Sequence, residues 1–296
     1  MVKEKNFFKG FEKKHSHLVC VDSDGCVMDT MDIKHFRCFG PEMVKEWGLD
    51  QEKEKLLAAW NRVNLYSMTR GVNRFKALYL VLKEYENENG EGEGKIEGLE
   101  DLKKWIETSP SLSKEKLKEA GERQNSIFLK KACRWSETVN RKIEQLPQEV
   151  KQPFDGVKHA LERIHREADV VVVSSANPEA VRDEWQHWGL LEYVDMVLAQ
   201  DAGSKAKCIE RMLSYGYNRE NVLMVGDAPG DLEAARMNAV CFYPILTGRE
   251  TESWERLEEE EISHFLKGQY AGNNQQEYIR RFEANLGGGA SEQRKA

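Results

Sequence analysis

Short apolar segments alternate with amphipathic segments through the second half of this 296-residue chain. The apolar segments have the length and composition of buried strands, whereas the segments between them repeat apolar residues at helical spacing. Strands are predicted at four places: residues 169–173, 193–198, 221–225 and 240–243. Strands that alternate with helices are typical of a parallel sheet covered by helices on both faces. The sequence therefore predicts an α/β fold with a doubly wound parallel sheet.

A fifth strand-like segment, residues 17–21, lies far upstream of the other four. The stretch between them contains almost no strand-type runs and carries helical periodicity instead. An acidic, glycine-rich segment, ENENGEGEGKIEG at residues 86–98, interrupts this stretch and predicts a loop. The sheet is therefore expected to combine two separate parts of the chain, with a helical module inserted after the first strand.

The same pattern predicts the domain limits. The α/β core is expected at residues 15–29 and 153–250, and the α-helical insert at residues 30–152. Residues 251–286 are expected to form a helical extension of the core. Residues 287–296 are expected to form a disordered tail.

Charge and apolar content narrow the partners that this chain could have. The formal net charge of −7 argues against a nucleic-acid or anionic-membrane surface as the main partner. The apolar runs are far shorter than the roughly 18 residues of a membrane span. Residues 1–14 are charged throughout and lack a secretory hydrophobic region. The six cysteines form no C-x-x-C pair, so we expect reduced thiols in a cytoplasmic protein.

Two aspartates follow the first predicted strand, in the segment VCVDSDG. Side chains at alternate positions of an extended chain share a face, so Asp22 and Asp24 can point together. One carboxylate could attack a phosphorus atom while the other exchanges protons with the leaving oxygen and with water. A solvated Asp-rich turn or a calcium loop would carry the same residues.

Two further aspartates follow the strand expected at residues 221–225, in VLMVGDAPGD. Asp227 stands at the strand end, and Asp231 stands in the first turn of a helix that Pro229 could begin. Acidic residues at a helix start can serve for capping alone. Carboxylates are also the hard oxygen ligands that Mg²⁺ prefers. Asp227 or Asp231, Asp22 and a carbonyl oxygen near residues 23–24 would suit this ion.

The remaining strand ends carry groups that could bind phosphate. Ser174, the adjacent Ser175 and Asn177 follow the second strand in VVVSSAN, where hydroxyl and amide groups could hold phosphate oxygens. A turn before a helix that begins at Pro178 explains the same residues. After the third strand, Lys205 could place a positive charge against a phosphoryl group. Lys207 is a close competitor for that role.

This order of residues at successive strand ends resembles the haloacid dehalogenase superfamily, whose four motifs occur in the same order. The resemblance implies a Rossmann-like fold and covers residues 17–29 and about 153–245. The helical insert is similar to the α-helical cap of the beta-phosphoglucomutase and phosphonatase branches. The resemblance implies that Asp22 is the nucleophile and Asp24 the acid/base. It also implies that Ser174 and Lys205 bind phosphate and that Asp227 and Asp231 are acids of the metal site. Cys26 departs from the family pattern, because many relatives have Thr there.

The resemblance and Asp24 together favour an enzyme that releases an alkoxide, since that leaving group needs a proton. We expect a Mg²⁺-dependent phosphatase that hydrolyses a small cytosolic phosphate monoester through an aspartyl-phosphate, with Asp22 and Asp24 also near the metal. A phosphomutase of the beta-phosphoglucomutase type is an alternative, and a non-catalytic phospho-switch is another. The resemblance leaves the substrate and the oligomeric state open.

The helical insert contains candidate substrate contacts. Arg70 and Arg74 could present guanidinium groups to a second anionic group of the substrate, or could face water at a helix end. Lys34 and His35 could line the entrance, although hinge-surface positions suit them better. The tryptophans at helical spacing in this region are expected to form its core.

Overall fold

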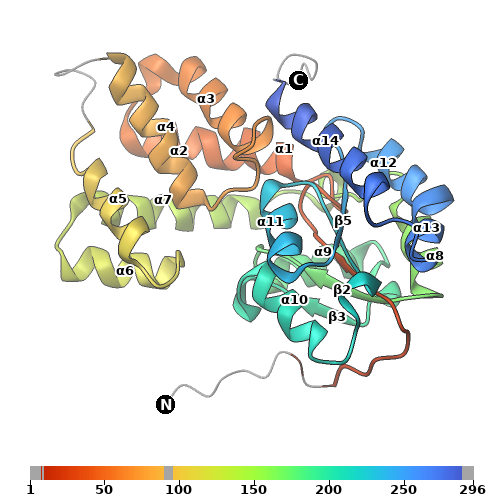
Figure 1. Cartoon of the computed structure of the whole chain (residues 1–296). Coiled ribbons are helices and arrows are strands. Elements are labelled where there is room, and N and C mark those ends of the chain that lie inside the picture. Colours follow the sequence, from red (N-terminus) through yellow and green to blue (C-terminus); the bar gives the residue numbers. More distant parts are fainter. Residues whose placement is uncertain (1–7, 9, 90–95, 289–296) are drawn as a thin grey trace. The chain divides into compact units, whose positions relative to one another are not determined.

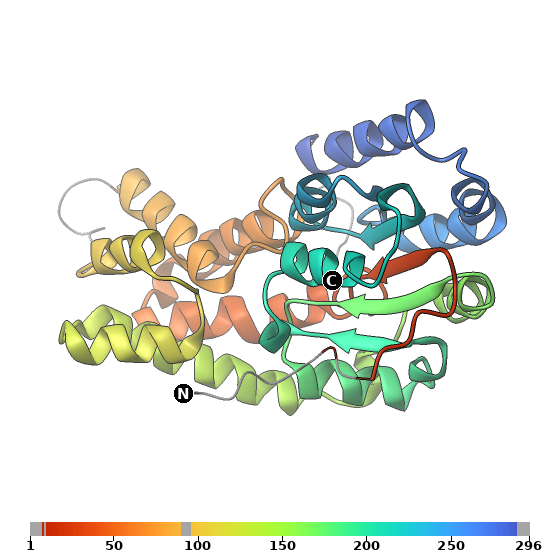
Figure 2. The same cartoon turned by 60° about the horizontal axis from the view of Figure 1, so that its bottom comes forward.

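Strand β1 (Leu18–Val21) lies at the centre of a five-stranded sheet with the order β3-β2-β1-β4-β5 (Figure 1). The computed structural model describes residue 8, residues 10–89 and residues 96–288. All four neighbouring strand pairs are parallel, and the arrows point the same way in Figure 2. The other strands are β2 (Asp169–Val173), β3 (Met196–Leu198), β4 (Val222–Gly226) and β5 (Cys241–Pro244). The predicted α/β fold with a parallel sheet is confirmed.

The sheet is buried on both faces because its strands are apolar at successive positions. Val19 and Val21 of β1 point into one buried cluster, and Leu18 and Cys20 point into another. Helices supply the other half of each cluster. The first cluster includes side chains of α8 (Val157–His165), α9 (Pro178–His187) and α12 (Glu250–Arg256). The second includes side chains of α10 (Lys205–Leu213), α11 (Pro229–Asn238) and α14 (Asn273–Gly287).

One predicted strand is shorter than expected. Of the strand predicted at 193–198, only Met196–Leu198 form strand β3, because Tyr193 ends a 3₁₀ helix (Leu191–Tyr193) and residues 194–195 are irregular. Pairing with β2 begins where the N–H of Asp195 donates to the carbonyl of Val170 at 2.8 Å. Apolar composition alone does not locate this start, because a short 3₁₀ turn can carry the same residues.

The C-terminal extension consists of several helices, and its last part lies along the edge strand β5. It contains α12, a π-helix (Leu257–Glu261), α13 (Ile262–Leu266) and α14. The break before α14 contains Gly268 and Gly272, which both have positive φ, at +68° and +85°. Gln275 accepts the N–H of Phe242 in β5, and the Tyr270 hydroxyl donates to the Phe242 carbonyl, both at 2.9 Å. These contacts satisfy backbone groups that an edge strand would otherwise expose.

The chain divides into two compact units, unit 1 (residues 1–31 and 147–296) and unit 2 (residues 32–146). Unit 1 contains the sheet. Unit 2 is helical and has its own buried apolar cluster, with a π-helix at His35–Phe39. Its principal helices are α2 (Gly40–Trp47), α3 (Lys53–Leu65), α4 (Arg74–Asn89), α5 (Leu99–Thr108), α6 (Lys114–Arg123) and α7 (Ile127–Glu144). The short helix α1 (Met31–Lys34) precedes them.

Two predicted irregular segments lie partly outside the described residues. Helix α4 continues to Asn89, into the acidic loop predicted at 86–98, and residues 90–95 of that loop are not described. Of the tail predicted at 287–296, Gly287 is the last residue of α14, and residues 289–296 are not described. Among the described residues, every helix is too short or too polar to cross a membrane.

Candidate active site

The carboxyl ends of three neighbouring strands bring polar residues to one edge of the sheet. Asp22 follows β1, Ser174 follows β2 and Asp227 follows β4. Backbone hydrogen bonds continue one residue beyond the strands, because the N–H of Asp22 donates to Val225 at 3.0 Å and that of Ser174 to Leu198 at 2.9 Å. These residues therefore lie on a rigid extension of the sheet, where ligands bind in open α/β folds.

Lys205 joins two of the predicted aspartates. It is the first residue of α10, and its Nζ lies 2.9 Å from Asp22 Oδ1 and 2.5 Å from Asp231 Oδ1. Lys207, the competing lysine, is exposed. The helix start is held by Ser204, whose hydroxyl oxygen accepts the N–H of Lys207 at 3.3 Å. The contacts of Lys205 thus favour it over Lys207 as the positive charge beside the aspartates, a choice that the sequence alone left open.

Asp231 has a second contact that holds it in place. Its Oδ2 accepts the N–H of Ala228 at 3.0 Å, which closes the turn between β4 and α11. The carboxylates of Asp22, Asp227 and Asp231 each offer an oxygen, and these oxygens all lie within 4.8 Å of one another. All three residues are at least 95% buried. The structure therefore gathers three buried acids at one point.

Burial and mutual repulsion shift the ionisation of this cluster. Burial raises the pKa of Asp22 well above its ordinary value, and the carboxylates of Asp231 and Asp227 add to the rise while Lys205 opposes it. Burial alone would lower the pKa of Lys205, yet Asp22 and Asp231 hold that pKa above its ordinary value. Lys205 is therefore charged at neutral pH, and additional positive charge would favour the ionised form of Asp22.

The donor set fits a hard divalent cation. The carboxylates of Asp22, Asp227 and Asp231 converge in a buried position. Within this group of four side chains, the single ammonium group of Lys205 balances only part of the negative charge. Oxygen donors of this kind suit Mg²⁺. Asp24 is not a member of this group of three, so its predicted place at the metal stays a prediction.

Asp24 lies in the loop that follows Asp22. Its Oδ1 accepts a hydrogen bond from the hydroxyl of Thr30 at 2.6 Å, and Thr30 is fully buried. Sequence reasoning did not single out Thr30. The only feature of the sequence that could have indicated Thr30 is its short distance along the chain from Asp24. The two side chains meet because of the geometry of the loop, which no periodic pattern predicts.

The three residues predicted to bind phosphate differ in their surroundings. Ser174 is buried, and its hydroxyl oxygen accepts the N–H of Ala176 at 3.2 Å. Ser175 is exposed. Asn177 is the N-cap of α9, where its Oδ1 accepts the N–H groups of Glu179 and Ala180 at 2.9 and 3.1 Å. The helix-capping alternative thus describes the Asn177 side-chain oxygen, and phosphate binding by these residues stays a prediction.

Both candidate arginines have contacts within unit 2. Arg70 is 3% exposed and donates to the carbonyl of Leu65 at 2.9 Å. Arg74 donates to Ser136 and Asn140 at 3.1 and 2.6 Å. These contacts fix the orientation of the guanidinium groups, and a role in substrate recognition stays a prediction.

Lys34 and His35, expected at the surface, are both buried at 5% and 8% exposure, so that expectation is wrong. The reason is tertiary packing. Trp60 Nε1 donates to His35 Nδ1 at 2.9 Å, and the His35 ring stacks on Phe39 with centroids 4.7 Å apart.

Residues 72–243 match the profile of the haloacid dehalogenase-like hydrolases, which is more than half of the chain. The chain belongs to this family. The predicted resemblance to haloacid dehalogenase enzymes is therefore confirmed, and the protein is a haloacid dehalogenase-like hydrolase. Asp22 and Asp24 precede the matched range, so their roles depend on the geometry described above. No curated protein sequence matches the chain.

Solved structures show the same fold in other haloacid dehalogenase-like proteins. A protein from Bacteroides fragilis described as a haloacid dehalogenase-like hydrolase is 9% identical, with a TM-score of 0.50 and coverage of 81% of this chain and 93% of that one. A protein from Lactobacillus delbrueckii assigned as a phosphoglycolate phosphatase is 12% identical, with a TM-score of 0.50 and coverage of 86% and 99%. A protein from Thermotoga maritima assigned as a beta-phosphoglucomutase is 18% identical, with a TM-score of 0.41 and coverage of 77% and 84%. For the two structures with a TM-score of 0.50, these identities limit the likeness to the fold.

Proposed function

We propose that this protein is a Mg²⁺-dependent phosphatase that hydrolyses a small phosphate monoester through an aspartyl-phosphate at Asp22. The observation that carries the proposal is the position of Lys205 Nζ, 2.9 Å from Asp22 and 2.5 Å from Asp231, beside a third buried acid, Asp227. A buried lysine between carboxylates provides positive charge where a phosphoryl group would meet its nucleophile.

The proposed reaction has two steps. In the first, a carboxylate oxygen of Asp22 forms a bond to phosphorus, the phosphorus–oxygen bond to the leaving group breaks, and protonated Asp24 gives its proton to the departing oxygen. In the second, Asp24 takes a proton from water as the water oxygen forms a bond to phosphorus and the bond between phosphorus and the Asp22 carboxylate oxygen breaks. Inorganic phosphate leaves, and the Asp22 carboxylate and the protonated Asp24 are restored.

The other residues of the site orient Asp22 and the phosphoryl group and balance their negative charge. Lys205 holds Asp22 in one orientation and adds positive charge for the phosphoryl oxygens. Asp22, Asp227 and Asp231 would hold Mg²⁺, which when bound would neutralise these carboxylates and polarise a phosphoryl oxygen. Ser174, at the adjacent strand end, would donate a hydrogen bond to the phosphate.

Asp24 favours a hydrolase over a phospho-switch. A switch needs a nucleophile, a lysine and a metal site, but it has no use for a second carboxylate that exchanges protons. The hydrogen bond from Thr30 to Asp24 fixes this second carboxylate in the loop beside Asp22. A carboxylate held in this way suits an acid/base role in hydrolysis.

Hydrolysis of p-nitrophenyl phosphate tests the proposal. We expect activity that requires Mg²⁺, disappears with EDTA and falls by about 10⁴-fold or more in Asp22→Asn, because the nucleophile is lost. Asp50→Asn, a change at an exposed aspartate of unit 2, is the matched control and should keep wild-type activity. Equal activity of Asp22→Asn and wild type would refute the proposal.

Binding of the metal can be measured without turnover. Mg²⁺ should raise the Tm of the wild-type protein, because an ion that binds only the folded state stabilises it. The rise should be smaller in Asp227→Asn, which has one carboxylate fewer at the site. An equal rise in both proteins would place the ion elsewhere.

A further inference from the structure

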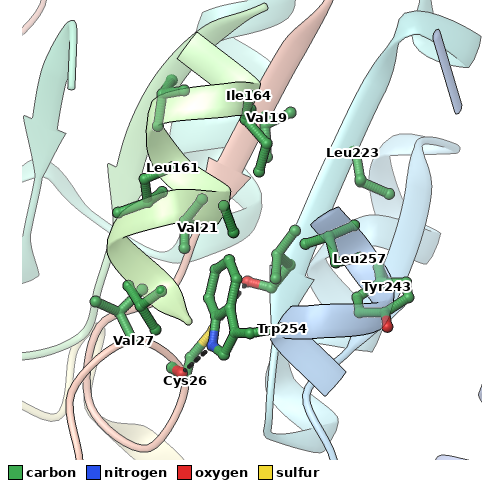
Figure 3. Close-up of a cluster of buried hydrophobic side chains, with 14 of the residues drawn as sticks. Val19, Val21, Cys26, Val27, Leu161, Ile164, Leu223, Tyr243, Trp254 and Leu257 are labelled. Atoms are coloured by element: carbon green, nitrogen blue, oxygen red, sulfur yellow. Dashed lines mark hydrogen bonds between the residues drawn. The ribbon is translucent and has the colours of Figure 1, made fainter. Parts of the chain in front are cut away.

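Two buried tryptophans from two different helices donate to one short loop, residues Ser23–Met28, which we call the Asp24 loop. Trp185 of α9 donates through Nε1 to the hydroxyl oxygen of Ser23 at 2.9 Å. Trp254 of α12 donates through Nε1 to the carbonyl oxygen of Cys26 at 2.9 Å, drawn as a dashed line in Figure 3. Both tryptophans are fully buried. The loop is thus held at two points by side chains that come from elements distant in the sequence.

The internal hydrogen bonds of the Asp24 loop make it a tight turn. The carbonyl of Ser23 accepts the N–H groups of Val27 and Met28, both at 2.9 Å. The N–H of Gly25 donates to Met28 at 2.9 Å, and Gly25 adopts a φ of +83°, which favours glycine. Because the turn is wound around Ser23, a shift of Ser23 or Cys26 would move Asp24 with it.

From these contacts we propose that Trp185 and Trp254 are positioning residues that orient Asp24 for proton transfer. The inference rests on the proposed phosphatase function. A proton donor must lie within hydrogen-bond reach of the leaving oxygen, and small displacements of reacting groups cost large factors in rate. The two indoles restrain the loop on both sides of Asp24 in the chain.

A buried indole needs a hydrogen-bond acceptor wherever it lies, so the bond alone does not imply a role in catalysis. Trp135 in unit 2 illustrates this, because it is fully buried and donates to the carbonyl of Phe39 at 3.2 Å. Trp185 and Trp254 differ from it in their target. Two separate helices direct their indole N–H groups to the same six residues, and those residues include the proposed acid/base.

The contact of Trp254 also gives the C-terminal extension a part in the reaction. Figure 3 shows Trp254 among Val21, Val27 and Leu161, with its nitrogen directed at Cys26. The aromatic ring fills the apolar cluster, and the N–H satisfies a carbonyl that would otherwise be buried among apolar groups. Replacement by phenylalanine removes the N–H and keeps an aromatic side chain, so it separates the hydrogen bond from packing.

A comparison of two esters tests the positioning role. Phenolate is a poor leaving group that needs a proton, whereas p-nitrophenolate leaves readily without one. For Trp185→Phe and Trp254→Phe we expect kcat/KM to fall by about tenfold or more on phenyl phosphate and by much less on p-nitrophenyl phosphate. Trp135→Phe, the matched control, should lose stability in the same way but keep the wild-type ratio of kcat/KM between the two esters.

Ser23→Ala provides a second variant, because it removes the acceptor of Trp185 and leaves every aromatic ring in place. It should shift the ratio between the esters as Trp185→Phe does, and it decides the matter if a tryptophan variant fails to fold. An unchanged ratio in an active protein overturns the positioning role and leaves the phosphatase function intact. A wild-type protein that hydrolyses neither ester overturns the proposed function and this inference with it.

Discussion

Gly226, the last residue of β4, has no room for a side chain. A Cβ added there would lie 2.4 Å from Asp231 Cγ, far inside contact distance. Asp231 in turn accepts hydrogen bonds from Lys205 and from the N–H of Ala228. The close approach of a glycine to a carboxylate therefore gives Asp231 its place, and through it the place of Lys205.

The variant Gly226→Ala should displace the Asp231 carboxylate. We expect a loss of about 1–3 kcal/mol in the free energy of unfolding, as for other overpacked sites, and a large loss of phosphatase activity. Gly230→Ala is the matched control, because an added Cβ there meets nothing within 4 Å and lies in helix α11. Denaturant unfolding and kcat measured on both variants check this, and similar results for the two would contradict it.

Asp195 supports the fold in a way that depends on pH. It accepts hydrogen bonds from Lys14 Nζ at 2.7 Å and from the N–H of Val170 at 2.9 Å, and His165 lies 3.3 Å away. Burial works to raise the pKa of Asp195, but these hydrogen bonds outweigh it and lower the pKa below its ordinary value. The stabilisation is therefore present above the unfolded pKa and is lost as the pH falls through the lower folded pKa.

Replacement of this carboxylate should cost stability only where it is ionised. We expect Asp195→Asn to lose about 1–3 kcal/mol in the free energy of unfolding at neutral pH. The difference from wild type should shrink below a pH of about 4. Urea unfolding at several pH values measures it, with Asp50→Asn as the exposed control. A difference that stays constant with pH would show that charge is not its source.

At the scale of elements, the C-terminal helices complete the sheet. Strand β5 is an edge strand, and Gln275 and Tyr270 bond the N–H and carbonyl of Phe242 within it. Without these helices, the edge and the buried aromatic residues of β5 would be exposed, which favours association between chains.

A chain truncated after Arg249 should therefore aggregate or fail to unfold cooperatively. A chain that ends at Gly288 keeps all the contacts described above and serves as control. Solubility and thermal unfolding followed by circular dichroism distinguish the two. A truncated chain with the Tm of the control would show that the extension is dispensable.

The elements also show which local signals can be read from sequence. Four of the five predicted strands match the structure to within one residue at each end, because apolar strands buried on both faces stand out from their surroundings. β3 is shorter than predicted because Tyr193 belongs to a 3₁₀ helix and residues 194–195 lie outside the strand. The π-helices at residues 35–39 and 257–261 have no pattern that distinguishes them from α-helix.

At the scale of the whole molecule, the two units have separate cores, and one unit is a single chain segment whereas the other combines two. Every residue of the buried cluster of unit 2 lies between Cys38 and Val139, inside one continuous segment. Unit 1 needs two segments, because β1 comes from the N-terminal one and the other strands come from the second. Unit 2 thus has what an independently folding domain requires.

Residues 32–146 expressed alone should fold into a helical protein that unfolds cooperatively. Trp135→Ala in this fragment should cost about 3–5 kcal/mol, because Trp135 is fully buried and its ring packs against those of Phe39, Trp60 and Phe75. Circular dichroism during heating measures both. An unfolded fragment would show that its core depends on unit 1.

Local patterns in the sequence determined the fold class, the discontinuous sheet and the residue types at the strand ends, because periodicity and strand length depend on nearby residues. Only the tertiary structure decided that Lys205 rather than Lys207 meets Asp22, and that Thr30 meets Asp24. The bond from Trp254 to Cys26 spans 228 positions of the chain. Such contacts depend on how helices pack against the sheet, and no local pattern encodes that packing.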